Sequence, residues 1–202
     1  MPVNLSDNRT QNAIKRLESA SFLPPIDFAH ILLVADGTKP GMFTGIQTDL
    51  YESRADIVDF HSDECSCITD VCNALGLSYA TRDDEVKVTT ELGIRYGNRR
   101  LYFIGPNRDT AQRLMSTHTA GDDLQLGRLL GFPESAIKSY INDTCMKVAS
   151  LPSNSQDVSS DQMKLLNHMI SIDGWEDEVR YLRVYAERLL AISPTIYRKC
   201  IS

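Results

Sequence analysis

Two charged residues that are able to contact a small ligand, Asp36 and Lys39, come directly after an apolar run of strand length, residues 30–35. We predict that this run is a buried strand leading into an exposed loop, residues 36–41. Residues beyond the carboxyl end of such a strand commonly line the ligand crevice of an α/β sheet. Asp36 and Lys39 are therefore candidate ligand contacts. The alternative is that Asp36 is an ordinary turn residue.

The triplet Asp36-Gly37-Thr38 is similar to the end of the Asp-x-Asp-Gly-Thr loop of haloacid dehalogenase-like phosphatases. In that loop the first aspartate is the nucleophile, and its position here is Val34. Because valine cannot act as a nucleophile, the covalent step is lost. We therefore do not expect phosphatase activity.

A third candidate contact is Arg108, which follows Gly105-Pro106-Asn107 at the start of a predicted helix, residues 108–117. Free N–H groups at a helix start, together with a guanidinium group, favour an anion such as phosphate. The alternative is a helix start without a ligand, in which Asn107 caps the helix.

The best-specified part of the chain is a helix-corner-helix that we predict within residues 122–141. Asp122 or Asp123 is suited to cap the first helix. Gly131 then ends it in the left-handed conformation, and Pro133 begins the second helix. Apolar residues at helical spacing predict two buried faces: Leu126, Leu129 and Leu130 on the first helix, and Ala136, Ile137, Tyr140 and Ile141 on the second.

Arg128 and Glu134 are left as polar residues near this corner. They either pair with each other or face a ligand. We favour the ligand role, because two glycines and a proline fix the backbone of the corner more tightly than a surface ion pair requires.

Residues 127–134, Gly-Arg-Leu-Leu-Gly-Phe-Pro-Glu, resemble the Gly-Arg-Leu-Leu-Gly-Tyr-Pro-Glu-Cys-Cys motif of an uncharacterised prokaryotic family, a domain of unknown function. Ser135 and Ala136 stand where that family has its paired cysteines. Any redox or metal chemistry of those cysteines would be absent here. The resemblance therefore implies architecture more than function, and it transfers no catalytic residue.

Four residues of types that zinc accepts lie close together in the sequence: His61, Cys65, Cys67 and Cys72. Their spacing matches no familiar zinc ribbon or finger and lacks a second Cys-x2-Cys half. Cys65 and Cys72 share one face of a predicted helix, which suits small core residues. We therefore predict no metal site, and metal binding by these four residues is the alternative.

The composition limits the partners of the chain. Its 202 residues carry a net charge of −6, whereas nucleic acids are bound by concentrated positive surfaces. No apolar run reaches the ~20 residues that cross a bilayer, and the N-terminus lacks a secretory signal. Five cysteines, an odd number, agree with a reducing compartment. We expect a cytoplasmic protein with no nucleic-acid and no membrane partner, and the oligomeric state stays open.

The remaining elements follow from hydrophobic periodicity. Helical spacing predicts helices from residue 9 to about residue 20, over 62–75, through 163–170 and over 175–192. Alternation predicts a short antiparallel meander with strands at 77–81, 85–92 and 99–104 and turns at 82–84 and 93–98. Residues 43–60 carry no specific prediction, and the loop-like residues 150–157 are the best candidate boundary.

Together these elements predict the α/β or α+β class, with a small mixed sheet, packed helices and a C-terminal helical pair. Residues 1–150 would form the core, and residues 151–202 would pack on it as part of one domain.

The function that we favour is an enzyme or ligand-binding domain for a small polar or anionic metabolite, without a cofactor. Its contacts would be Asp36, Lys39, Arg108, Arg128 and Glu134. The alternative is a non-enzymatic interaction or regulatory protein that uses its C-terminal helices. Polar residues converging in one enclosed cleft favour the first function, and an exposed apolar patch on the last helices favours the second.

Overall fold

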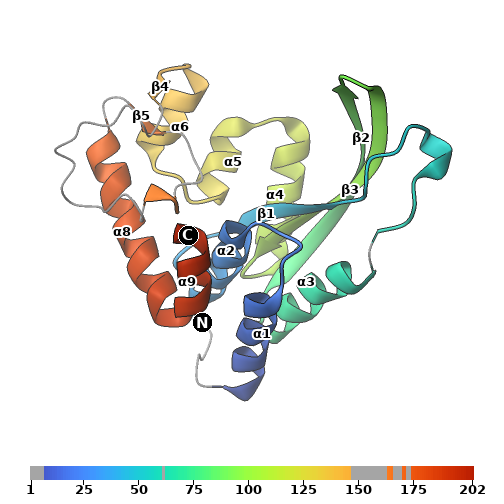
Figure 1. The fold of residues 1–202 in the computed structure, drawn as a ribbon. Helices are drawn as coiled ribbons and strands as arrows, with labels where there is room; N and C mark the ends of the chain where they lie inside the picture. Colours follow the sequence, from blue (N-terminus) through green and yellow to red (C-terminus); the bar gives the residue numbers. More distant parts are fainter. Residues whose placement is uncertain (1–6, 61, 147–162, 166–169, 172–173) are drawn as a thin grey trace.

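A computed structural model describes residues 7–60, 62–146, 163–165, 170–171 and 174–202 (Figure 1). The helices are α1 (Asn8–Ser19), α2 (Pro25–Asp36), η1 (Arg54–Asp56, a 3-10 helix), α3 (Ser62–Ala74), α4 (Arg108–Ala120), α5 (Asp123–Leu129), α6 (Glu134–Ile141), α8 (Trp175–Ile192) and α9 (Pro194–Ile201). The strands are β1 (Met42–Gln47), β2 (Ser78–Thr90), β3 (Gly93–Gly105), β4 (Cys145–Met146) and β5 (Ile170–Ser171). The predicted class, a small sheet with packed helices and a C-terminal helical pair, is confirmed.

The main sheet has three strands in the order β1-β3-β2, with β3 in the centre. Both pairs are antiparallel, so this sheet is not mixed in direction. Strands β2 and β3 form one long hairpin in which Thr90 is opposite Gly93. Residues 91 and 92 alone close the turn, and the hairpin reaches beyond the helices that cover the rest of the sheet (Figure 1).

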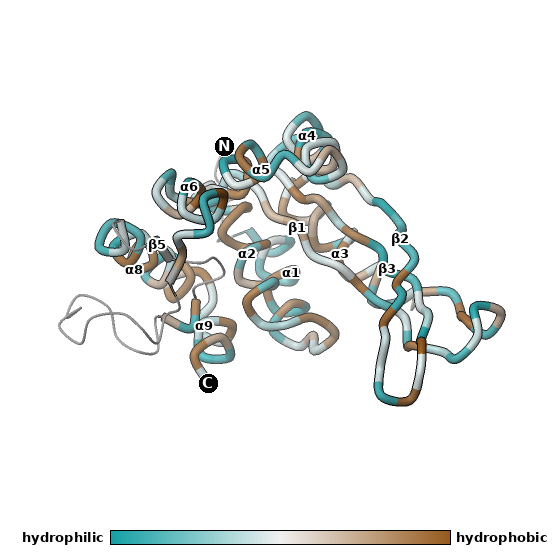
Figure 2. Tube along the Cα trace, turned by 90° about the horizontal axis from the view of Figure 1, so that it is seen from above, coloured by the Kyte–Doolittle hydropathy of each residue, from teal (hydrophilic) through white to brown (hydrophobic). Residues whose placement is uncertain are grey.

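Helices cover both faces of the sheet at its buried end, where side chains of β3 alternate between two hydrophobic clusters. Leu101 and Phe103 pack with Leu114 of α4, whereas Tyr102 and Ile104 belong to the cluster formed with α1, α2 and α3. Figure 2 shows the resulting layers, with α4 on one side of the sheet and α1 and α2 on the other. The central strand is therefore buried on both faces over residues 101–105.

The C-terminal helices α8 and α9 pack against α2, and several of their buried residues, among them Tyr185, Leu189 and Ile196, belong to the same cluster as α1 and α2. Helix α8 has the predicted bounds, and Leu190 near its end is 47% exposed. The helix predicted through residues 163–170 lies partly outside the described residues, and Ile170 is in strand β5. The predicted boundary at residues 150–157 also lies outside them. No helix of the described part is long and apolar enough to cross a membrane.

Residues 30–35 lie in helix α2, so the prediction of a strand was wrong. The helix begins with Pro25 at its first position, and Gly37 ends it with φ of 82°. All residues from Phe28 to Ala35 are buried, because the sheet, α8 and α9 surround the helix. A helix buried on every side has no polar face, and a short apolar run then looks the same as a buried strand.

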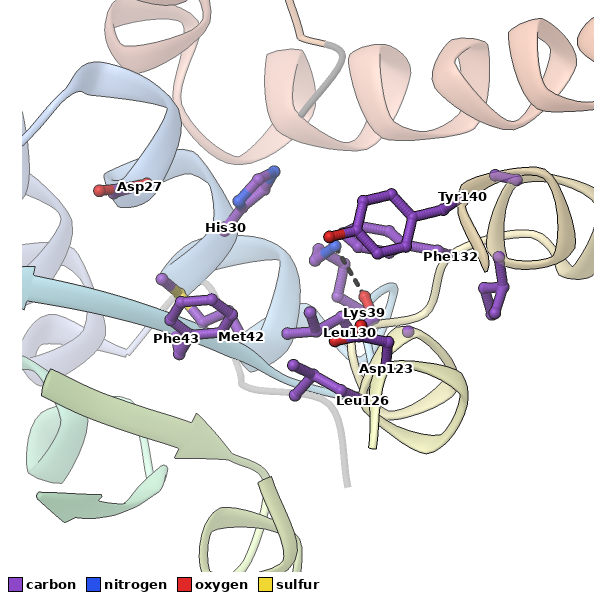
Figure 3. Close-up of a pocket in the computed structure, with 13 residues that line it drawn as sticks. Asp27, His30, Lys39, Met42, Phe43, Asp123, Leu126, Leu130, Phe132 and Tyr140 are labelled. Carbon is purple, nitrogen blue, oxygen red and sulfur yellow. Dashed lines mark hydrogen bonds between the residues drawn. The ribbon is translucent and has the colours of Figure 1, made fainter. Parts of the chain in front are cut away.

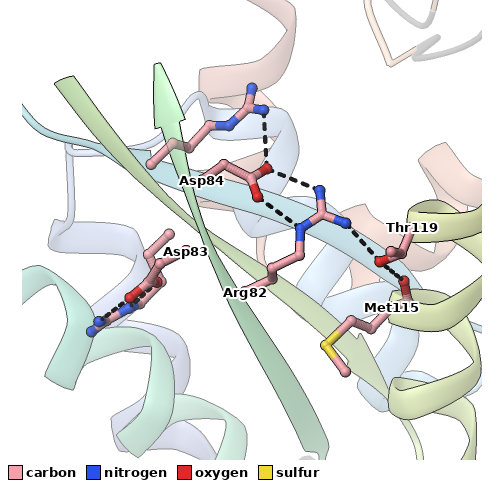
Figure 4. Close-up of polar contacts among 7 residues, drawn as sticks. Arg82, Asp83, Asp84, Met115 and Thr119 are labelled. Carbon is pink, nitrogen blue, oxygen red and sulfur yellow. Dashed lines mark hydrogen bonds and ion pairs between the residues drawn. The ribbon is translucent and has the colours of Figure 1, made fainter. Parts of the chain in front are cut away.

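Residues 82–84, which we predicted as a turn, continue strand β2. Figure 4 shows how their charges are paired: Arg82 donates two hydrogen bonds to the carboxylate of Asp84, at 2.8 and 2.9 Å. Arg82 also donates to the hydroxyl of Thr119 on α4 at 2.7 Å, and Asp83 pairs with Arg100 across the hairpin. These charges find partners on β2 itself, on β3 and on α4, so the strand does not need to break here.

Candidate functional site

A cavity of about 350 Å³ lies between the helix α2, the start of β1 and the corner that joins α5 to α6 (Figure 3). Most of the side chains that line it are apolar: Met42, Phe43, Leu126, Leu130, Phe132, Ala136, Ile137 and Tyr140. Four polar side chains also line it: Asp27, His30, Lys39 and Asp123. The site is thus a mostly apolar cavity with a few polar groups, which is typical of small-molecule sites.

The corner between α5 and α6 forms one wall of the cavity, and its geometry follows from local sequence. Asp122 caps α5 by accepting a hydrogen bond from the Gln125 N–H at 3.0 Å. Gly131 has φ of 75°, as predicted, and the next residue donates its N–H to the carbonyl of Gly127 at 3.0 Å. A Cβ atom on Gly127 would lie 2.8 Å from Cγ1 of Ile137, so glycine lets the two helices approach closely.

The predicted buried faces of the corner are only partly correct. Leu130, Ala136 and Ile137 are buried, but Tyr140 is 57% exposed and Ile141 is also exposed. The ring of Tyr140 lies at the cavity instead of in the core (Figure 3).

Lys39 is the most unusual residue of the cavity, because it is a lysine that is only 2% exposed. Its Nζ donates a hydrogen bond of 2.9 Å to the carbonyl oxygen of Leu130. The same atom lies 5.3 Å from the ring centroid of Phe132 and 5.1 Å from that of Tyr185. No carboxylate of the described residues forms an ion pair with it, and burial lowers the pKa of Lys39 to about 8.

Asp27, in the first turn of α2, supplies a carboxylate to the same cavity. Its Oδ2 accepts a hydrogen bond of 2.8 Å from the hydroxyl of Thr44 on β1. Burial raises the pKa of Asp27, and the hydrogen bond from Thr44 offsets part of that increase. Within the described part of the chain, no cationic side chain forms an ion pair with this carboxylate.

His30 lies one helical turn after Asp27 and is buried on the wall of the cavity (Figure 3). The two side chains share a face of α2 because residues three apart are neighbours on a helix. Figure 3 shows His30 between Asp27 and Lys39. The wall formed by α2 and the residues just after it therefore presents a carboxylate, an imidazole and an ammonium group in that order.

Of the five predicted ligand contacts, Lys39 is on the cavity. Asp36 instead forms an ion pair with Arg188 of α8, with a hydrogen bond of 2.9 Å from Arg188 Nε to its Oδ2. It also accepts a hydrogen bond from the hydroxyl of Thr38. Burial alone would raise the pKa of Asp36, but the bonds from Arg188 and Thr38 outweigh it and lower the pKa.

Arg128 and Glu134 pair with each other on the surface, through hydrogen bonds of 2.6 and 3.0 Å between the guanidinium and the carboxylate. Their side chains are 44% and 51% exposed, and neither lines the cavity. Arg108 is exposed at the start of α4 and is not on the cavity either. Asn107 caps that helix by accepting the N–H of Thr110 at 2.9 Å.

Lys39 is the one residue on the cavity that was predicted as a ligand contact, and the residues that were missed include Asp27, His30 and Phe43. Asp27 and His30 belong to the helix that we interpreted as a loop and a strand, and Phe43 begins the stretch that carried no prediction. Asp27 and His30 are three residues apart, which is a helical spacing. This signal becomes visible once Pro25 is recognised as a helix start.

The cysteines are not joined by disulfides. Cys67 and Cys72 are buried, and Cys65 is half-buried against the core. Among the residues that the structure describes, which exclude His61, no group of three metal-ligand side chains is close enough to hold a metal ion.

Comparisons of this chain with protein-family models, with curated proteins and with solved structures found no significant match.

Ser135, which takes the place of the first cysteine of the similar motif, donates a hydrogen bond of 2.6 Å to Glu178 and so links α6 to α8.

Proposed function

We propose that the cavity binds a small organic anion with an apolar body, in an enzyme or a ligand-binding protein. The observation that carries this proposal is the buried ammonium group of Lys39, which lines the cavity without a carboxylate partner among the described residues. A buried charge without a counter-charge costs free energy of folding. Proteins keep such charges mainly at functional sites.

The size and the walls of the cavity support this class of ligand. Its volume of about 350 Å³ lies at the lower end of the range for small-molecule sites, roughly 300–1,000 Å³. Phe43, Leu126 and Phe132 would bury the apolar part of the ligand. The acidic group would lie at Lys39, where a charge-assisted hydrogen bond is strong because water is excluded.

His30 and Asp27 give the same wall two groups that serve as general acids and bases in enzymes. A bound molecule would lie against both. The proposed binding of an anion does not require that the protein also catalyses a reaction of that anion.

Thermal-shift screening tests the proposal. We expect small aliphatic and aromatic carboxylates to raise the melting temperature, because a ligand that binds only the folded protein stabilises it. The amide of each acid is the matched control, since it has nearly the same shape and no charge. Carboxylates that produce no larger shift than their amides would contradict the proposal.

The alternative function, an interaction module that uses the C-terminal helices, has less support. Helix α8 exposes two large apolar side chains, Val184 and Leu190. They are six residues apart, which at about 100° per residue places them on different sides of the helix. They therefore do not form the single apolar patch that this function requires.

A further inference from the structure

The cavity carries opposite charges at its two ends. Asp27 lies in the first turn of α2, and Lys39 lies just beyond the last turn of the same helix. The helix rises about 1.5 Å per residue, so the backbone advances roughly 13 Å from Asp27 to the end of α2. Figure 3 shows the two side chains on either side of His30, and neither one shifts the pKa of the other.

Each of these two charges retains capacity for a further partner. Oδ2 of Asp27 accepts the hydroxyl of Thr44, and no donor within the described part of the chain reaches Oδ1. Lys39 has three N–H groups, of which one donates to the carbonyl of Leu130. The rings of Phe132 and Tyr185 lie near its Nζ but accept no conventional hydrogen bond.

We infer that the ligand is an elongated molecule with two charged ends, an acidic group bound at Lys39 and an ammonium group bound at Asp27, joined by an apolar middle. This inference rests on the proposed function, and it adds an ammonium group at the other end of the ligand. A monocarboxylate would neutralise Lys39 and leave the half-buried carboxylate of Asp27 without a counter-charge. A molecule that supplies both counter-charges removes both costs at once.

Two other polar residues on the cavity, Asp123 and Tyr140, do not supply a counter-charge to Lys39. Asp123 is exposed at the start of α5 and forms no ion pair with Lys39. Tyr140 is more than half exposed at the mouth. Burial lowers the pKa of Lys39 and raises the pKa of Asp27. The two shifts have the same cause, because each charge is removed from water and has no charged partner within the described residues.

The direct test is a calorimetric titration with ω-aminoalkanoates whose chains have about four to ten carbons, because the length that fits best is set by the span of the cavity. Each compound is compared with the monocarboxylate and the alkylamine of the same length. At the best length we expect the amino acid to bind at least about tenfold more tightly than the monocarboxylate.

Two variants separate the ends. Asp27→Asn should remove the advantage of the amino acid and leave binding of the monocarboxylate in place, whereas Lys39→Met should weaken both. Asp109→Asn, an exposed aspartate at the start of α4 that does not line the cavity, is the matched control and should change neither.

The possible failures are distinguishable. Equal affinities of the amino acid and the monocarboxylate at every length would overturn the two-ended ligand and leave the proposed function standing. Binding of no member of the series, or binding that Lys39→Met does not weaken, would overturn both.

Discussion

Lys39 Nζ donates a 2.9 Å hydrogen bond to the carbonyl oxygen of Leu130, 91 positions further along the chain. This bond joins the end of α2 to the corner between α5 and α6. One side chain therefore holds two walls of the cavity together and also brings a positive charge to it. Unfolding of a Lys39 variant measures the structural role of this side chain, and ligand titration of the same variant measures its role toward a ligand.

Lys39→Met should relieve the protein of a buried charge at neutral pH. In the folded state the pKa of Lys39 is lowered from 10.5 to about 8, so the charged lysine costs on the order of 3 kcal/mol below pH 8. Between about pH 8 and 10.5 the unfolded chain binds more protons than the folded one, so the wild type gains stability as the pH rises. The stability of Lys39→Met relative to the wild type should therefore fall over this range.

Urea unfolding of both proteins from pH 7 to about pH 10.5 measures this difference, and effects of other groups cancel in it. Lys87→Met is the control, because Lys87 is exposed on β2 and its replacement should give no comparable trend. A difference between Lys39→Met and the wild type that stays constant with pH would show that the buried lysine carries no such cost.

Gly131→Ala should destabilise the corner for two reasons. Gly131 has φ of 75°, which costs a residue with a Cβ atom about 1–2 kcal/mol. The added Cβ would also lie 2.5 Å from Cδ of Pro40, whose ring cannot move aside easily. Gly37→Ala is the matched control, because Gly37 has φ of 82° and its Cβ would meet nothing within 4 Å. Equal losses of stability in the two variants would show that the contact with Pro40 has no effect.

Leu182→Ala should lower the free energy of unfolding by about 2–5 kcal/mol, because the side chain is 1% exposed and its loss leaves a cavity. Leu190→Ala removes the same atoms from the same helix at a site that is 47% exposed, so its effect should be much smaller. Denaturant unfolding compares the two. Similar midpoints for both variants would mean that α8 is not part of the folded core.

Arg128→Ala should change the melting temperature little, because its pair with Glu134 is exposed to solvent and exposed ion pairs contribute little to stability. We also expect it to leave the thermal shift produced by carboxylates unchanged, since Arg128 does not line the cavity. If that shift disappeared in this variant while the melting temperature held, the ligand role that we favoured from the sequence would be correct after all.

The sequence was most informative where each element carries its own start and stop signals. Helix α8 and the corner with Gly131 follow from local periodicity and local backbone requirements, so they were predicted closely. Helix α2 was not, because burial on every side removes the polar face that distinguishes a helix from a strand. Residues 82–84 were misread as a turn, because two of their partners lie far along the chain: Arg100 on β3 pairs with Asp83, and Thr119 on α4 accepts a hydrogen bond from Arg82. The local sequence does not reveal these contacts.

The candidate site was predictable only in part. Lys39 was selected because it follows an apolar run. The run does lead to the cavity, but it is a helix and not the strand that we predicted. Asp27 and Phe43 reach the cavity because β1 runs back along α2, a relationship between elements that no local pattern encodes. Arg128 and Glu134 lie close together as expected, but only the packed structure shows that they face away from the cavity.

The most direct test of the central claim is the affinity of wild type and Lys39→Met, measured by calorimetry, for the carboxylate that gives the largest thermal shift. At pH 7 we predict that the variant binds at least about tenfold more weakly, a loss of about 1.4 kcal/mol or more. The affinity of the wild type should also fall as the pH rises above about 8, because the ammonium of Lys39 loses its proton. Equal affinities of the two proteins at pH 7 would contradict the claim that Lys39 binds the anion.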